Sequence, residues 1–117
     1  MNKIYHLANC STCQRIIKEL NNGEGFTLQN IKEEAITPEQ IDAMAEKAGS
    51  YEALFSRRAM KYRAMGLHEQ SLSEADYRRL ILEEYTFLKR PVMLIGEEQF
   101  VGNSKKVVAA AVAALNQ

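Results

Sequence analysis

The chain has few of the residues that build metal centres, and it has no long apolar run. Among its 117 residues are two cysteines, two histidines and no tryptophan. A structural zinc site needs about four ligands, so it would require both cysteines together with His6 and His68, and no second C-x-x-C is present. No apolar run approaches the roughly 20 residues that cross a bilayer, so the sequence predicts neither a bound metal nor a membrane span.

The chain also lacks a net charge. Its 15 lysines and arginines balance 15 aspartates and glutamates. A neutral protein does not attract nucleic acid or an anionic membrane as a whole, so any charge-based recognition must be local. Residues 1–5 lead directly into an apolar strand and do not look like a signal peptide. We therefore expect one cytoplasmic domain over residues 1–117, without a direct nucleic-acid or membrane partner.

What the sequence does contain is a C-x-x-C motif, Cys10-Ser11-Thr12-Cys13, at a predicted strand–turn–helix junction. Residues 4–7 predict a buried strand, and residues 11–20 carry apolar side chains at helical spacing. The first N–H groups of a helix have no partner within the helix, and the helix dipole adds positive charge there. Both effects lower the pKa of a cysteine. Such a motif is typical of thioredoxin-like redox proteins, and in a reducing compartment it is more often catalytic or sensing than structural.

The two cysteines are not equivalent in this pattern. Cys13, Ile17 and Leu20 recur at the spacing of one helix face, so Cys13 shares the apolar stripe. Cys10 lies where the chain enters the helix, and we interpret it as the exposed nucleophile and Cys13 as the sheltered resolving thiol. Two alternatives stay open at this point. The pair could be half of a zinc site, or two inert buried thiols, because free cysteine often behaves as a small hydrophobic residue.

The segment after the first helix predicts a second strand over residues 26–31, with Phe26 and Leu28 facing inward. This strand completes a β-α-β unit, which favours a parallel pair with a right-handed crossover. The following span, residues 37–86, is mostly helical in its pattern. A capping box at Thr37-Pro38-Glu39-Gln40 begins one helix, residues 51–65 continue with helical spacing, and Ser73 caps a further helix.

The remaining residues predict a β-hairpin and a last helix. Residues 92–95 and 99–101 form the two strands, joined by a turn longer than two residues. Ser104 is placed to cap a helix whose alanine-rich body covers residues 107–115.

With this order of elements, the chain resembles, over its whole length, the family of ArsC-type arsenate reductases and Spx transcriptional regulators. The stretches that carry the resemblance are Cys10-Ser11-Thr12-Cys13, Ser56-Arg57-Arg58, Leu88-Lys89-Arg90-Pro91 and Val101-Gly102. The resemblance implies an α/β, thioredoxin-like fold with a mixed four-stranded sheet in the order β-α-β … β-β-α. It also implies an α-helical insert subdomain, about residues 37–86, between the second and third strands.

The resemblance further implies a site around Cys10 as nucleophile. The residues expected to bind the substrate or its anion are Arg58, Arg90, Pro91, Ser11 and Thr12. Guanidinium groups suit a tetrahedral oxyanion because they bind it bidentately, and the proline that faces the nucleophile in this family is usually cis. The arsenate reductases carry a third arginine after the hairpin, which Gly102-Asn103-Ser104 lacks here. Lys105 and Lys106 are candidates to replace part of its charge.

Two functions follow from the resemblance. The first is a thiol–disulfide oxidoreductase of the arsenate reductase type, linked to glutaredoxin and glutathione, acting on a small oxyanion or a disulfide. It would bind no cofactor and would take electrons from an external thiol, either glutathione with glutaredoxin or thioredoxin. The alternative is an Spx-like regulator that binds RNA polymerase and uses the cysteine pair as a redox switch. Although the presence of Cys13 and the missing third arginine favour the switch, we rank the enzyme first.

Overall fold

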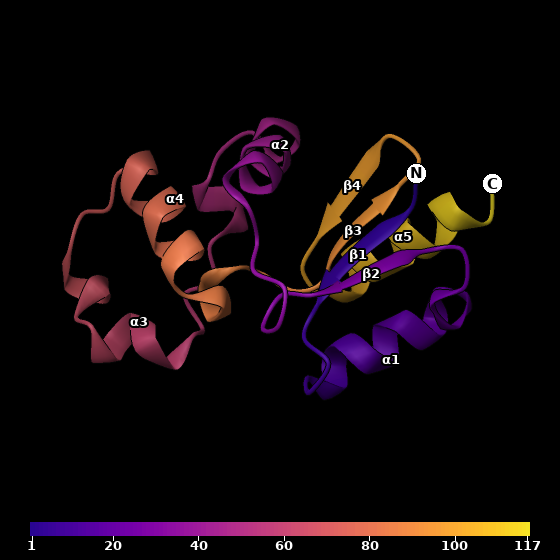
Figure 1. The fold of residues 1–117 in the computed structure, drawn as a ribbon, viewed down its shortest axis with the longest axis horizontal. Coiled ribbons are helices and arrows are strands. Elements are labelled where there is room, and N and C mark those ends of the chain that lie inside the picture. The colour runs from indigo at the N-terminus through magenta and orange to yellow at the C-terminus, as the bar shows by residue number, and fades with distance from the viewer. The chain divides into compact units, whose positions relative to one another are not determined.

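Four strands form one mixed sheet, in the order β2-β1-β3-β4, in a computed structural model that describes residues 1–117 (Figure 1). The strands are β1 (Lys3–His6), β2 (Thr27–Asn30), β3 (Val92–Ile95) and β4 (Glu98–Val101). β1 pairs in parallel with β2 and antiparallel with β3, and β4 pairs antiparallel with β3. The mixed four-stranded sheet predicted from the sequence is thus confirmed.

The chain divides into two compact units. The first comprises Met1–Glu34 and Arg90–Gln117 and contains the sheet, and the second comprises Ala35–Lys89. The predicted helical insert, residues 37–86, falls inside the second unit. That the two units form one domain stays a prediction. No helix in the structure combines the length and the apolar character needed to cross a membrane.

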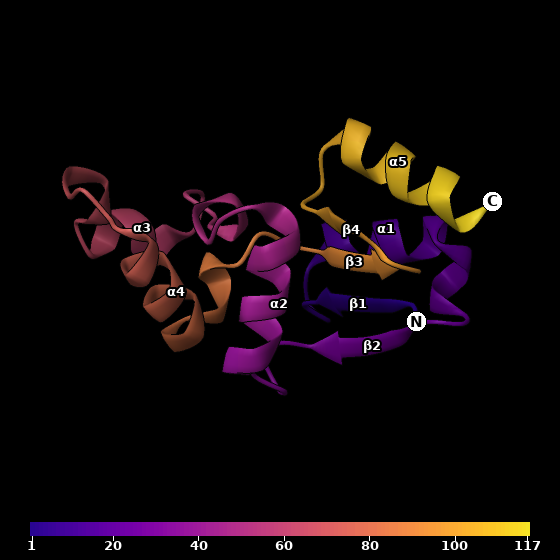
Figure 2. The ribbon, with the colours of Figure 1, turned by 90° about the horizontal axis from the view of Figure 1, so that it is seen from above.

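Helices α1 (Ser11–Glu19) and α5 (Lys105–Leu115) cover one face of the sheet (Figure 2). Ile4 of β1 pairs with Met93 of β3, so the two side chains lie on the same face, and both are fully buried. They pack in one apolar core with residues of both helices, Ile16, Ile17, Leu20, Val108 and Ala111. Burial of each large aliphatic side chain contributes about 1.5–3 kcal/mol, so this core fixes α1 against the sheet.

Strand β2 differs from its prediction in which side chains are buried. Phe26 packs against the core as expected, but Leu28 is 44% exposed and Gln29 is 1% exposed. β2 is the edge of the sheet, where the helical layer covers Leu28 incompletely. Gln29 points to the opposite face, and its Nε2 donates a hydrogen bond to the Glu34 carbonyl oxygen at 3.0 Å. Leu28 pairs with the core residue Ile4 and so lies on the predicted face of the sheet, but it is not buried there.

The hairpin between β3 and β4 is tighter than predicted. Ile95 pairs directly with Glu98, so only Gly96 and Glu97 lie in the turn. Gly96 has φ +61°, a conformation that favours glycine, and its N–H donates to Asn2 Oδ1 at 2.9 Å. This positive φ allows the two-residue connection.

The second unit contains α2 (Pro38–Ala48), α3 (Met60–Ala64) and α4 (Glu74–Glu83), with 3₁₀ turns between them. The capping box that begins α2 is confirmed: Gln40 N–H donates to Thr37 Oγ1, and Thr37 N–H donates to Gln40 Oε1. Ser73 caps α4 as predicted, and Asp76 completes a second capping box there.

The prediction of helical structure over residues 51–65 was right for only part of that span. Only a 3₁₀ turn, Glu52–Leu54, and the short α3 are helical. Between them Phe55 is extended and pairs with Leu88, while its ring lies 5.0 Å from that of Phe87 and 4.9 Å from that of Tyr77, centroid to centroid. Packing of this aromatic cluster outweighs the helical spacing of the local sequence.

Candidate active site

The two cysteines lie where the chain passes from β1 into α1. Cys10 N–H donates to the Leu7 carbonyl oxygen at 3.1 Å, which closes a tight turn after the strand. Cys10 is the N-cap residue of α1, and its own carbonyl oxygen accepts from Gln14 N–H at 3.1 Å. Its side chain is partly exposed, whereas Cys13 is fully buried against the sheet, as the helical spacing predicted.

The environment of Cys10 favours the thiolate. Burial by itself raises the pKa of Cys10, but several interactions more than offset that effect. The sulfur accepts hydrogen bonds from the backbone N–H groups of Cys13 and Thr12 and from the Cys13 thiol, and the charge of Arg90 acts in the same direction. The net pKa of Cys10 is therefore lower than its ordinary value, which is the effect predicted for a cysteine at a helix start.

The environment of Cys13 favours the thiol. Burial is the largest cause and raises the pKa of Cys13 to about 11, with the negative charge of Cys10 adding to the rise. A hydrogen bond from the Leu7 backbone and the charge of Arg90 oppose these effects only in part. The pair is thus polarised: one sulfur is ready to ionise and the other retains its proton and donates it as a hydrogen bond.

Arg90 and Pro91 are far from the cysteines in the sequence but belong to the same compact unit. The Arg90–Pro91 peptide bond is cis, as the resemblance implied. Gly102 N–H donates to the Pro91 carbonyl oxygen at 2.9 Å, and Asn103 Nδ2 donates to the Arg90 carbonyl oxygen at 3.2 Å. The segment after β4 therefore holds the backbone of both residues, and the Arg90 charge lowers the pKa of Cys10.

The other residues predicted for the site are placed differently. Thr12 contributes through its backbone N–H, as described above, and Ser11 is an exposed residue in the first turn of α1. Arg58 belongs to the second unit, where it is exposed before α3 and its backbone N–H donates to Ser56 Oγ at 3.4 Å. Its role in binding an anion at Cys10 stays a prediction.

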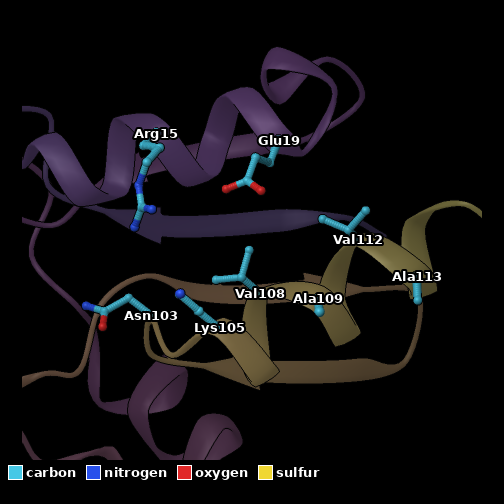
Figure 3. A pocket seen from close by; sticks show the side chains of 8 residues that line it. All are labelled: Arg15, Glu19, Asn103, Lys105, Val108, Ala109, Val112 and Ala113. Carbon is cyan, nitrogen blue, oxygen red and sulfur yellow. The ribbon is translucent and has the colours of Figure 1, made fainter.

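Two features of this unit were not singled out as functional in the sequence. One is His6, which is 7% exposed, whose Nδ1 has no hydrogen-bond partner and whose pKa is lowered by burial. The other is a groove between α1 and α5, which contains the polar side chains Arg15, Glu19, Asn103 and Lys105 (Figure 3). Arg15 and Glu19 follow Ser11 at intervals of four residues, so helical periodicity could have placed them on one face of α1. Nothing in the sequence near them indicates that α5 lies opposite this face.

The strand–C-x-x-C–helix junction and the cis-proline strand together define a redox-type site on a thioredoxin-like fold. The model of the ArsC family matches residues 5–111 of the chain. The chain therefore belongs to the ArsC family. A search of functionally curated proteins found no match.

Solved structures with the same fold span nearly the whole chain. The YffB (PA3664) protein superposes with a TM-score of 0.81 at 22% identity, covering 96% of this chain and 99% of its own. An arsenate reductase from Vibrio cholerae gives a TM-score of 0.79 at 18% identity, covering 94% and 96%. An arsenate reductase (ArsC) related protein from Brucella melitensis gives 0.71 at 24% identity, covering 93% and 92%. At these identities the similarity establishes the thioredoxin-like fold.

Proposed function

We propose that this protein is a thiol–disulfide oxidoreductase of the arsenate reductase type, with Cys10 as nucleophile and Cys13 as resolving thiol. The observation that carries the proposal is the placement of the pair: Cys10 is partly exposed at the N-cap of α1, whereas Cys13 is fully buried. The pKa values follow this placement, since the pKa is lowered at Cys10 and raised to about 11 at Cys13. A nucleophile must be a thiolate before the reaction, whereas a resolving thiol needs to ionise only afterwards. Membership of the ArsC family supports the same reaction class.

The reaction with a disulfide proceeds in two exchanges. The Cys10 thiolate attacks one substrate sulfur, forms a mixed disulfide and releases the other sulfur as a thiolate. Cys13 then loses its proton and attacks the Cys10 sulfur, which forms the Cys10–Cys13 disulfide and releases the second substrate thiolate. The substrate gains two electrons and the protein loses two.

The interactions between the two cysteines also delay the second exchange until the mixed disulfide has formed. Once Cys10 is bonded to the substrate it no longer carries a charge, and it no longer accepts the hydrogen bond from Cys13. Both of these interactions raise the pKa of Cys13 beforehand, although burial is the larger cause. Formation of the mixed disulfide therefore makes Cys13 more acidic at the step in which it must react.

The groups available for an oxyanion favour disulfides over arsenate. The stretch Gly102-Asn103-Ser104 lacks the third arginine that the resemblance to arsenate reductases leads us to expect there, and the Asn103 amide donates to the Arg90 carbonyl oxygen at 3.2 Å. Each charge-assisted contact that is missing costs about 1.5–3 kcal/mol, or one to two decades in affinity. We therefore propose weak arsenate reduction, with Arg58 and Arg90 as the guanidinium groups, and stronger reduction of small disulfides.

An external thiol must return the two electrons to the protein. In each turnover, two thiol groups are oxidised to one disulfide. The test is the oxidation of NADPH coupled through glutathione and glutaredoxin, beside a thioredoxin couple, with a small disulfide or arsenate as oxidant. With the disulfide, we expect the protein to add turnover above that of the coupling system alone, and Cys10→Ser to abolish the added turnover. Added turnover that survives in Cys10→Ser, or that neither couple supports in the wild type, would contradict the proposal.

A second candidate function is an Spx-like regulator that binds RNA polymerase, with glutaredoxin or thioredoxin only resetting its switch. The observation that favours it is the hydrogen bond between the two cysteines, because a pair so close can act as a stoichiometric redox switch. Binding of RNA polymerase by the oxidised protein, lost in Cys13→Ser, would support this candidate. Multiple turnovers per protein molecule in the NADPH assay would favour the enzyme.

A further inference from the structure

Strand β2 lies at one edge of the sheet and has backbone groups that no strand pairs with on its outer side (Figure 2). Thr27 N–H and Ile31 N–H donate to carbonyl oxygens in and next to β1, so the odd-numbered residues of this stretch turn their backbone groups toward β1. Backbone groups alternate in direction along a strand. The Leu28 N–H and carbonyl, the Asn30 N–H and the Phe26 carbonyl therefore face outward.

This edge lacks the usual protection against pairing with another strand. Exposed edges are commonly blocked by charged residues, by proline or by a bulge. The opposite edge, β4, follows this rule, since it begins at the exposed Glu98 directly after Glu97. Strand β2 reads Thr-Leu-Gln-Asn, without a charge or a proline, and the Leu28 side chain is 44% exposed. The edge at β2 is therefore the one to which a further strand can be added.

A second copy of β2 fits this edge because the strand is complementary to itself about Leu28. In an antiparallel pair centred on Leu28, its N–H and carbonyl exchange two hydrogen bonds with those of the second copy. The Asn30 N–H of each copy then faces the Phe26 carbonyl oxygen of the other, which adds two more. The copies are related by a two-fold axis, as in most protein dimers. The two Leu28 side chains lie next to each other on one face of the joined sheet and cover each other.

The charges that flank β2 match in the same register. Glu24 lies four residues before Leu28, and Lys32 lies four residues after it. In the antiparallel pair, Glu24 of each copy therefore faces Lys32 of the other. Both side chains are exposed, and neither belongs to an ion pair of the structure. Because they lie just beyond the strand, at the rim of the contact, they favour this register and orientation more than they add affinity.

We propose that β2 is the dimerisation edge of this protein, where two copies join antiparallel, in register at Leu28, into one eight-stranded sheet. The strand order is then β4-β3-β1-β2, continued by β2-β1-β3-β4 of the second copy. The two-fold axis is perpendicular to the sheet, so α1 and α5 of both copies lie on the same side. Since the contact is small, the dimer exchanges with the monomer rather than forming permanently.

The test is self-association measured by sedimentation equilibrium from micromolar to millimolar concentrations, with a reductant present so that no intermolecular disulfide contributes. The first variant is Leu28→Lys, which sets two cations against each other at the centre of the contact. Its matched control is Met60→Lys, because Met60 is 91% exposed and belongs to the second unit. The second set exchanges charges and consists of Glu24→Lys, Lys32→Glu and their double variant. Glu98→Lys makes the same charge change on the opposite edge and is the control for this set.

We expect Leu28→Lys to weaken self-association at least tenfold, and each single charge change to weaken it about threefold or more. The double variant again sets opposite charges across the axis, so its dissociation constant should return to within about twofold of the wild type. The two controls should leave the dissociation constant unchanged. Amide hydrogen exchange at Leu28 and Asn30 should slow as the protein concentration rises, because both N–H groups are bonded in the dimer.

Three outcomes would overturn the proposal. One is a wild type that stays monomeric at millimolar concentration. Another is a dimer whose dissociation constant Leu28→Lys leaves unchanged, since the copies would then meet on another surface. The third is a double variant that associates no better than the single charge variants, because the register about Leu28 would then be wrong. Thermal unfolding confirms that each variant is folded, and the charge exchange carries the test if Leu28→Lys is not.

Discussion

The difference in ionisation between the two cysteines predicts a large difference in reactivity. A thiol with the ordinary pKa of 9.0 is about 1% ionised at pH 7, and Cys10 lies below that value, so it is ionised to a greater extent. Cys13, with a pKa of about 11, is about 0.01% ionised at the same pH. The thiolate fractions therefore differ by about two orders of magnitude or more.

The assay is alkylation by iodoacetamide as a function of pH, with Cys13→Ser retaining only Cys10 and Cys10→Ser retaining only Cys13. Removing Cys10 also removes two interactions that raise the pKa of Cys13, so the two single-cysteine variants should differ less in reactivity than the two cysteines of the wild type. Burial is the largest cause of the raised Cys13 pKa, and it persists in Cys10→Ser. We expect the Cys10-only variant to react at least tenfold faster at pH 7, with a midpoint below pH 9. Both variants should react alike in denaturant. Faster alkylation of the Cys13-only protein at neutral pH would refute the assignment of roles.

Three further predictions concern the same site. Mild peroxide should produce an intramolecular Cys10–Cys13 disulfide, seen by mass spectrometry as a two-hydrogen loss within one peptide; only intermolecular dimers would argue against it. Arg90→Gln should raise the pKa of Cys10. Both Arg90→Gln and Arg58→Ala should slow the reaction of Cys10 with anionic oxidants several-fold, with little change in melting temperature. A large fall in melting temperature with unchanged reactivity would make these arginines structural. Asn103→Arg should increase arsenate turnover about tenfold or more, and robust wild-type turnover at micromolar arsenate, without a gain in the variant, would contradict the argument from the missing arginine.

The features that could be predicted from the sequence are those set by local chemistry. The placement of Cys10 at a helix start and of Cys13 on the apolar stripe follows from spacing alone, and both burial states agree with it. The capping box at Thr37 and the cap at Ser73 were equally local, because each is completed within three residues. The cis Arg90–Pro91 bond was expected from the family resemblance, since proline alone seldom implies it.

The features that could not be predicted depend on partners distant in the sequence. Phe55 leaves the helical pattern because it pairs with Leu88 and packs on Phe87, more than 30 residues away. The exposure of Leu28 depends on the position of β2 at the edge of the sheet. The groove combines α1 with α5, which no motif in either segment indicates.

In the proposed mechanism, Cys10 forms the bond to the substrate and Cys13 releases the substrate. Incubation of Cys13→Ser with glutathione disulfide, followed by peptide mass spectrometry, tests this most directly, because the mixed disulfide cannot be resolved internally. We expect a stable glutathione adduct on the Cys10 peptide of Cys13→Ser and only a transient one in the wild type. An adduct that forms on Cys13 in Cys10→Ser, with none on Cys10, would contradict it.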